Sequence, residues 1–148
     1  MIAALYVVIT FSLAAISFGA IQVRPAEAFN HLASYNKRYI FAVTMGCVIA
    51  NVFSPLGIVD VFVGGGSTLG MLLAIYFVSK RLSNETTKLV ANTLIACLFM
   101  FPIAIELHFV SNLPIIGTFI SLAISEAISM VVGGLLIKAV ARKVDLYQ

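Results

Sequence analysis

Long apolar runs separated by short polar connections dominate this sequence. The first run, Ile2 to Gly19, carries no charged residue and is long enough to cross the hydrocarbon core of a bilayer as a helix. Four similar runs follow, and each is bounded by polar, Pro or Gly residues. They are Tyr39 to Phe53, Val61 to Ser79, Leu89 to Leu107 and Leu113 to Ile137. The pattern therefore predicts five membrane-spanning helices.

The segment from Pro25 to Tyr35 decides whether a sixth crossing exists. It begins with Pro, which suits the first position of a helix, and continues through good helix formers, but it is short for a span. Basic residues concentrate on the cytoplasmic side, so their positions separate the two topologies. With six crossings and a cytoplasmic N-terminus, eight of the nine Lys and Arg residues are cytoplasmic and Arg24 alone is outside. With five crossings the N-terminus would lie on the opposite side from Lys37 and Arg38, and we predict six, with both termini cytoplasmic.

Composition agrees with the bilayer as the solvent. Of the 148 residues, 61% are hydrophobic and 10% are charged, which would leave a soluble domain without enough polar surface. Residues 1–148 are therefore expected to form a single transmembrane domain, and the first run is kept because it lacks the basic start of a signal peptide. Cys47 and Cys97 both lie within apolar runs, which favours buried free thiols over a disulfide. The net charge of +3 does not imply nucleic acid.

Acidic and amide side chains gather toward the outer ends of the predicted helices. In the six-crossing topology these ends carry Arg24, Glu27, Asn51, Asp60, Glu106 and Asn112. Glu126 lies deeper, inside the last apolar run, where a carboxylate is costly unless a partner or a cavity stabilises it. Any one of these residues also suits an ordinary place at the membrane interface. Together they predict a substrate-binding pocket.

Small residues predict where the helices pack closely. Ser121, Ser125, Ser129 and Gly133 recur every four residues along the last run, a spacing that allows two helices to approach each other. Gly66 with Gly70 and Ala15 with Gly19 repeat the spacing elsewhere. Pro102 is expected to kink or interrupt the fifth run.

Motifs for catalysis are missing. The sequence has no His-Glu-x-x-His, no Gly-x-Ser-x-Gly and no cluster of Cys and His ligands, so neither intramembrane hydrolysis nor metal chemistry is indicated. The stretch Gly64 to Thr68 lacks the Lys of a phosphate-binding loop, and flexible packing at the start of a helix is the better interpretation. We therefore expect no enzyme activity, no cofactor and no metal, and any energy that the protein uses must come from a partner or a gradient.

Several stretches resemble one family of membrane transporters, the QueT family. They are Ser17 to Phe29, Gly46 to Asn51, Gly57 to Asp60 and Thr68-Leu69. The most specific parts are Arg24, Glu27 and Ala28 together with the pair Asn51 and Asp60, and the later spans match mainly in their hydrophobic pattern. Members of this family look like the substrate-binding S components of energy-coupling factor (ECF) transporters, so the resemblance implies an all-α bundle of six transmembrane helices.

The resemblance also implies partners and a ligand. The partners would be one transmembrane coupling subunit and two cytoplasmic ATPases, and the ligand a queuosine precursor, 7-aminomethyl-7-deazaguanine. Its ring-edge N–H groups and ammonium suit carboxylates, its carbonyl suits an Asn, and its flat face suits an aromatic ring such as Phe29 or Phe109. S components commonly carry an Ala-x-x-x-Ala docking surface on the first span, whereas here Ala3 and Ala4 are followed by Val7 and Val8.

Three other functions stay open on the residues alone. One is an S component for another vitamin or base, because a fold does not fix its ligand. Another is a membrane scaffold whose carboxylates serve only hydrogen bonds between helices. A proton-coupled carrier ranks last, because no inverted repeat is evident and few charges could form a relay.

Overall fold

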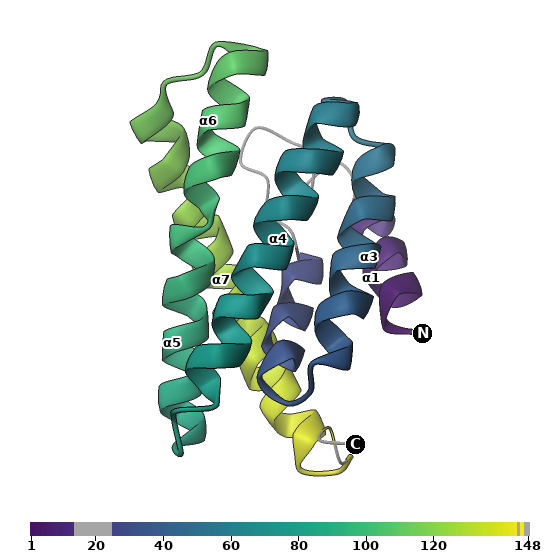
Figure 1. Cartoon of the computed structure of the whole chain (residues 1–148), viewed down its shortest axis with the longest axis vertical. Helices are drawn as coiled ribbons and strands as arrows, with labels where there is room; N and C mark the ends of the chain where they lie inside the picture. Colours follow the sequence, from purple (N-terminus) through teal and green to yellow (C-terminus); the bar gives the residue numbers. More distant parts are fainter. Residues whose placement is uncertain (14–24, 145, 147–148) are drawn as a thin grey trace.

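The computed structural model describes residues 1–13, 25–144 and 146, and every regular element in these ranges is helical (Figure 1). In chain order the elements are α1 (Ile2–Ser12), η1 (Pro25–Ser34), α3 (Arg38–Val52), α4 (Ile58–Ser79), α5 (Glu85–Leu98), α6 (Met100–Ser111) and α7 (Ile115–Ala141). η1 is a 3₁₀ helix and the others are α-helices. The described part of the chain thus has the predicted all-α class.

Three of the described helical rods are long and apolar enough to cross a membrane. They are α4, the 27-residue rod Glu85–Ser111 formed by α5 and α6, and α7. α1 and α3 are apolar but shorter, and the end of the first predicted run, from residue 14 to Gly19, lies outside the described residues. Large apolar side chains such as Phe41, Phe62 and Phe77 are exposed on the outside of the bundle, where a bilayer would cover them.

The rod formed by α5 and α6 is interrupted where the sequence predicts it. Pro102 has no N–H to offer the carbonyl of Leu98, and its ring would collide with that carbonyl in a regular helix. α5 ends at Leu98, Phe99 has a backbone ψ of −1°, and α6 begins at Met100. The expected interruption near Pro102 is therefore confirmed, and it lies one turn before the proline itself.

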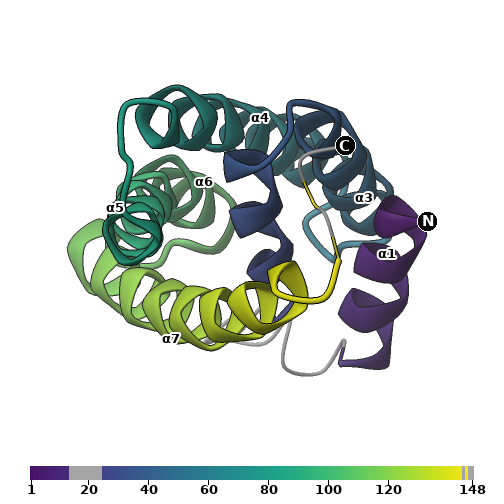
Figure 2. The same cartoon turned by 90° about the horizontal axis from the view of Figure 1, so that it is seen from below.

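η1 occupies the middle of the bundle. Figure 2 shows it surrounded by the other helices, and it contacts α1, α3, α4, α5 and α7. The helix predicted from Pro25 to Tyr35 is therefore present, but ten residues of 3₁₀ helix rise only about 20 Å, less than the thickness of the hydrocarbon core. Its crossing of the membrane stays a prediction. Six of its residues are buried, including Glu27, Asn30 and His31.

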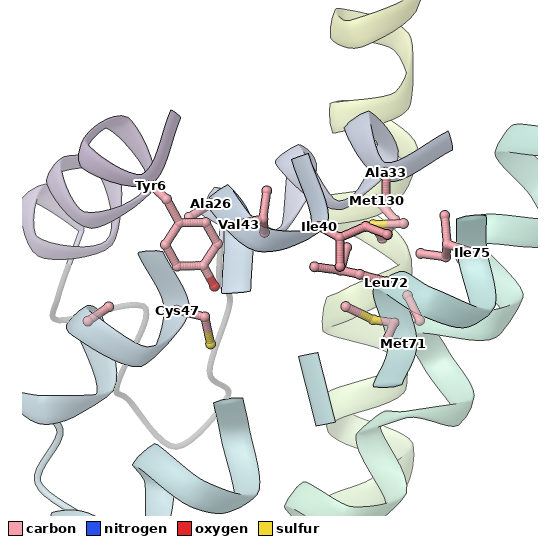
Figure 3. Close-up of a cluster of buried hydrophobic side chains, with 12 residues drawn as sticks. Tyr6, Ala26, Ala33, Ile40, Val43, Cys47, Met71, Leu72, Ile75 and Met130 are labelled. Atoms are coloured by element: carbon pink, nitrogen blue, oxygen red, sulfur yellow. The ribbon is translucent and has the colours of Figure 1, made fainter. Parts of the chain in front are cut away.

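An apolar core joins η1 to its neighbours. Figure 3 shows Tyr6, Ala26, Val43, Cys47 and Met71 in this core, together with Leu72, Ile75 and Met130. The side chains come from α1, η1, α3, α4 and α7. The predicted burial of the Cys47 thiol is confirmed, whereas Cys97 is partly buried; both are free cysteines.

Small residues bring α7 against η1. A Cβ placed on Gly133 would overlap the Cβ and Cα atoms of Ala28, so only glycine allows this approach. Ser125 and Ser129 are buried, and the predicted close packing along α7 is confirmed. The spacing of Gly66 and Gly70 behaves differently, since Gly66 is exposed and a Cβ there would meet nothing within 4 Å. Ala15 and Gly19 lie outside the described residues.

Candidate functional site

A buried carboxylate on η1 organises the first part of the site. Glu27 is 2% exposed; Tyr6 Oη donates a hydrogen bond of 2.8 Å to Glu27 Oε1, and Asn30 Nδ2 donates one to Oε2. Because a 3₁₀ helix has three residues per turn, Glu27 and Asn30 lie on one face. Donors to both carboxylate oxygens offset part of the cost of burying the charge.

Asn30 has capacity left for another group. Its side chain is fully buried, and Nδ2 also lies 4.0 Å from Met71 Sδ. Its Oδ1 accepts no hydrogen bond from any residue that the structure describes. Buried amide oxygens are normally paired, so this atom is an acceptor suited to a polar ligand. Asn30 and Tyr6 were not predicted from the sequence, although Asn30 stands one 3₁₀ turn after Glu27.

The second part of the site lies where α3 meets α4. Asn51, near the end of α3, donates from Nδ2 to the backbone oxygen of Asp60, at a distance of 3.0 Å. Asp60 is fully buried in the first turn of α4, where the helix dipole favours a carboxylate. Asn51 Nδ2 also lies 3.5 Å from Cys47 Sγ, which in turn contacts Thr68 Oγ1 at 3.3 Å.

Gly64 connects the two parts. A Cβ on Gly64 would lie 2.9 Å from Asp60 Oδ1 and would overlap Asn51 Nδ2, so both side chains rest against this glycine. Gly64, Thr68 and Glu27 line one small cavity, together with Ser67, Met71, Phe99, Met100 and Ile103. The cavity measures about 10 Å³, which is room for about one water molecule. The stretch Gly64 to Thr68 lies inside α4, so its predicted place at the start of a helix is wrong.

The other predicted site residues lie at different distances from this cavity. Glu106 is 4% exposed on α6, one turn beyond Ile103, which lines the cavity. Glu126 is also buried, on α7, which packs against α5. Asn112 is exposed and ends α6 with φ 53°, in the left-handed region. Arg24 lies outside the described residues.

Aromatic side chains are arranged differently from the sequence-based expectation. Phe109 is 79% exposed, and Phe29 packs against two apolar clusters. Phe99 lines the cavity beside Glu27 and was not predicted. Phe99 caps the end of α5, at the interruption of the helix before Pro102.

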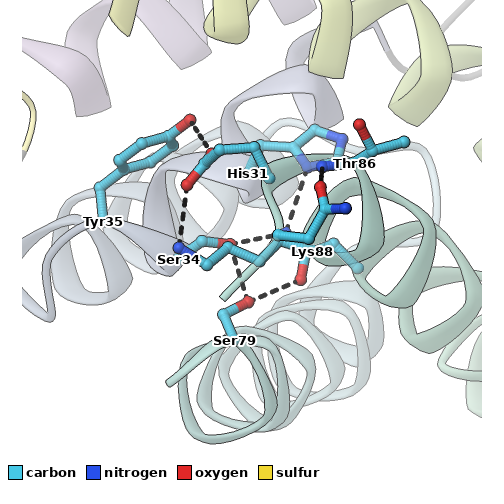
Figure 4. A network of polar contacts seen from close by, with 9 residues as sticks. His31, Ser34, Tyr35, Ser79, Thr86 and Lys88 are labelled. Atoms are coloured by element: carbon cyan, nitrogen blue, oxygen red, sulfur yellow. Dashed lines mark hydrogen bonds and ion pairs between the residues drawn. The ribbon is translucent and has the colours of Figure 1, made fainter. Parts of the chain in front are cut away.

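A second polar layer, which the sequence reasoning missed, lies around His31 and Ser34 of η1 (Figure 4). His31 Nε2 is 2.8 Å from the carbonyl oxygen of Met130, which can only accept, so Nε2 carries the proton and Nδ1 accepts from Asn92 Nδ2 at 3.3 Å. Asn92 Nδ2 also donates to Ser34 Oγ, and Asn92 Oδ1 accepts from Ser79 Oγ at 2.9 Å. The signal available in the sequence was the placement of Ser79 and Asn92 in apolar runs.

The chemistry of the site is that of binding. Glu27, Asn51, Asp60 and Asn30 supply acceptors, and Asn51 and Asn30 supply N–H donors, in a region without bulk water. Among the described residues no group of three or more His, Cys, Asp or Glu side chains could hold a metal ion. Such an arrangement suits a small ligand that carries several N–H donors.

Known proteins place the chain in a family. The model of the QueT transporter family matches residues 1–142. The chain is 41% identical over 155 residues to the queuosine precursor transporter QueT of Lactococcus lactis subsp. cremoris (strain MG1363), and the match covers 98% of this chain and 90% of that protein. No solved structure matches the chain.

Proposed function

Because the chain belongs to the QueT transporter family, we propose that it is the substrate-binding membrane subunit of an ECF importer for a queuosine precursor. The observation that carries the proposal is a pair of buried carboxylates: Glu27 lines the small cavity, and Asp60 lies against Gly64, which also lines it. Burying a carboxylate among apolar helices is expensive. A cationic ligand rich in N–H donors would offset that cost by pairing with the carboxylates.

The ligand that fits this chemistry is 7-aminomethyl-7-deazaguanine. In our proposal one carboxylate accepts the two N–H groups of the ring edge and another balances the ammonium, with Glu27, Asp60 and Glu106 as the candidates. Asn51 or Asn30 would serve the remaining polar positions. Phe99 would contact the flat face of the base. Glu126, Asn112 and Arg24 stay predictions as ligand contacts.

Binding would require the cavity to open. Its present size of about 10 Å³ is far below the roughly 300 Å³ or more of typical ligand pockets. Met71 and Met100 line it, and methionine side chains adapt easily because they are unbranched and flexible. We expect the ligand to displace these two side chains and Phe99, so that the bound and free forms differ mainly on the α4 and α6 sides.

The membrane arrangement belongs to the same proposal. Six crossings by one domain over residues 1–148, with both termini cytoplasmic, would leave eight of nine basic residues on the cytoplasmic side. The chain has no nucleotide-binding motif, so a coupling subunit and two ATPases would supply the energy. Thiols introduced at Met1 and at Lys37 test the topology, because these two positions lie on the same side with six crossings and on opposite sides with five. Labelling of one position but not the other by an impermeant reagent from outside intact cells would contradict six crossings.

Calorimetry with 7-aminomethyl-7-deazaguanine tests the site. Glu27→Gln, Asp60→Asn and Glu106→Gln retain the shape of each side chain but lose the charge. A contact through an ionised carboxylate is worth about 1.5 to 3 kcal/mol, so each residue that binds should raise the Kd roughly ten- to a hundredfold when changed.

Glu85→Gln is the matched control, because Glu85 lies at the start of α5 beside Lys88, at a distance of 2.9 Å. A loss of affinity in this variant equal to that of the other three would indicate general damage. If Glu27→Gln, Asp60→Asn and Glu106→Gln all bind like the parent, the assignment of the pocket is wrong.

A further inference from the structure

A second, larger cavity lies at the end of the bundle where η1 and α4 end and α5 begins. It measures about 370 Å³ and is lined by Lys37, Lys80 and Lys88 together with polar side chains that include Ser34, Tyr35 and Tyr76. We call it the basic pocket. Its volume lies in the range of ligand sites, and Ser34 and Ser79 of the second polar layer form part of its wall.

The three lysines come from three separate segments. Lys37 lies between η1 and α3, Lys80 is the C-terminal cap of α4, and Lys88 is in the first turns of α5. Two of the ammonium groups are held in place. Lys88 Nζ is 2.9 Å from Glu85 Oε1, and the other oxygen of this carboxylate, Oε2, accepts a hydrogen bond of 3.2 Å from Tyr35 Oη. Lys80 Nζ lies 4.5 Å from the centre of the Tyr76 ring.

Among the described residues, the carboxylate that pairs with the lysines of the basic pocket does not balance their three charges. Glu85 is the one carboxylate that pairs with these lysines in the described part of the chain, and it pairs with Lys88. Lys37 and Lys80 form no ion pair with any described residue. We propose that the basic pocket binds the headgroup phosphate of an anionic phospholipid.

Its place in the fold favours a lipid over a soluble phosphate. The pocket opens where the apolar length of α4 ends, which is the depth of the headgroups for a spanning helix. Phe77 and Val78 are exposed just before Lys80, so acyl chains below a bound headgroup would meet apolar side chains. Basic pockets between helices at this depth are known to hold anionic headgroups.

Native mass spectrometry of the full chain in zwitterionic detergent, titrated with phosphatidylglycerol, tests the proposal. The pocket variant is Lys37→Gln with Lys80→Gln, which leaves the pair of Glu85 and Lys88 intact. Each lysine near a headgroup contributes about fivefold, so the double variant should bind phosphatidylglycerol roughly 25-fold more weakly.

The matched control is Lys138→Gln with Lys143→Gln, which removes the same charge near the end of α7, outside the pocket. It should bind phosphatidylglycerol within about threefold of the parent, since general attraction to the membrane surface is weak and shared. If both double variants lose the same affinity for phosphatidylglycerol, general attraction by positive charge explains the binding, and the proposal is overturned. The proposal is also overturned if the pocket variant binds phosphatidylglycerol like the parent, provided that both double variants keep the parent's unfolding temperature in phosphatidylcholine nanodiscs.

Inorganic phosphate separates the two sources of the anion. Thermal unfolding is measured in detergent without anionic lipid, with and without inorganic phosphate. We expect phosphate to leave the unfolding temperature unchanged and phosphatidylglycerol to raise it. Stabilisation by phosphate alone that is lost in the pocket variant would overturn the lipid headgroup and assign the pocket to a soluble phosphate. The result does not depend on the deazaguanine ligand, so it can fail or succeed separately from the transport proposal.

Discussion

Two stripes of the same central helix carry polar side chains with different balances of donors and acceptors. The stripe of Glu27 and Asn30 faces Tyr6 and Met71, and that of His31 and Ser34 faces Asn92 and Ser79. In the second stripe the amide of Asn92 uses both N–H groups and its oxygen. In the first, Asn30 Oδ1 accepts nothing from the described residues. A neutral, fully paired layer suits a scaffold, whereas a charged layer with a spare acceptor suits a ligand.

The geometry of η1 explains how one short segment can carry both a fully paired polar layer and a layer suited to a ligand. With three residues per turn, positions 27 and 30 form one row and positions 31 and 34 form the next, about a third of a turn away. An α-helix would instead gather these four positions on one face of about 100°, without two separate rows. The two rows are therefore close in space but contact different helices, and substitutions can separate their roles.

The largest expected effect disturbs both rows at once. Gly133 allows α7 to contact Ala28 of η1. Gly133→Leu should therefore prevent η1 from packing against α7, and no folded protein should be recovered. Gly133→Ala should still fold, with a loss of about 1 to 3 kcal/mol of stability. The measurement is the yield of monodisperse protein and its unfolding temperature in detergent.

Leu136→Ala is the comparison for Gly133, because Leu136 is 60% exposed on the same helix. It should leave the yield within about twofold of the parent, as most surface changes do. If Gly133→Leu is purified as well as Leu136→Ala, the contact with Ala28 does not hold η1 in place, and the two rows are not coupled through α7.

The next largest effect separates the rows. Asn92→Ala removes three hydrogen bonds of the paired layer, and at roughly 0.6 kcal/mol each inside a membrane the loss is about 2 kcal/mol. Ligand affinity should stay within about threefold of the parent. Asn30→Ala should do the reverse, with a small loss of stability and a roughly tenfold higher Kd, because Glu27 loses a donor. Unfolding and calorimetry on both variants measure the contrast.

Equal effects of the two Asn substitutions on affinity would contradict this division of roles. The same holds if Asn92→Ala weakens the ligand more than Asn30→Ala does. Asn92→Asp serves as a further control, since it keeps the acceptor for Ser79 Oγ but loses the N–H groups that reach His31 and Ser34.

A smaller effect is expected at two neighbouring glycines of α4. A methyl group on Gly64 would press against Asp60 Oδ1 and Asn51 Nδ2, so Gly64→Ala should weaken the deazaguanine ligand about tenfold through displaced side chains. On Gly66 a methyl group meets nothing within 4 Å, and Gly66→Ala should leave affinity unchanged and add up to about 1 kcal/mol of stability. Equal Kd values for the two variants would remove Gly64 from the site.

The sequence predicts the described rods well, since a run of some 20 apolar residues has few alternatives in a membrane. The apolar runs correspond to α1, α3, α4, the rod of α5 and α6, and α7, and Pro102 marks the break in that rod because its effect on the backbone is local. Gly133 was predicted as a position of close helix packing because small residues repeat every four positions along α7, which is also a local pattern.

The polar layers are harder to predict because their partners are distant in sequence. Asn92 meets Ser34 and His31 across 58 and 61 residues, and no local pattern encodes such pairs. The sequence also did not reveal that Pro25–Ser34 forms a 3₁₀ helix, which sets the faces of Glu27 and His31. Glu27 and Asp60 were easier to find, because carboxylates are rare in so apolar a sequence.

The smallest expected effect concerns Asn112, which the charge-derived topology grouped with the site. Here the chain ends α6 at φ 53°, a conformation in which Asn and Gly are favoured over other residues. The turn accounts for Asn112 without a ligand. Asn112→Gly should therefore be neutral, and Asn112→Ala should lose about 1 kcal/mol of stability. Both should keep the parent's Kd within about twofold, because the side chain is exposed. A tenfold loss of affinity in both variants, measured by calorimetry, would return Asn112 to the site and extend the ligand-binding region to the end of α6.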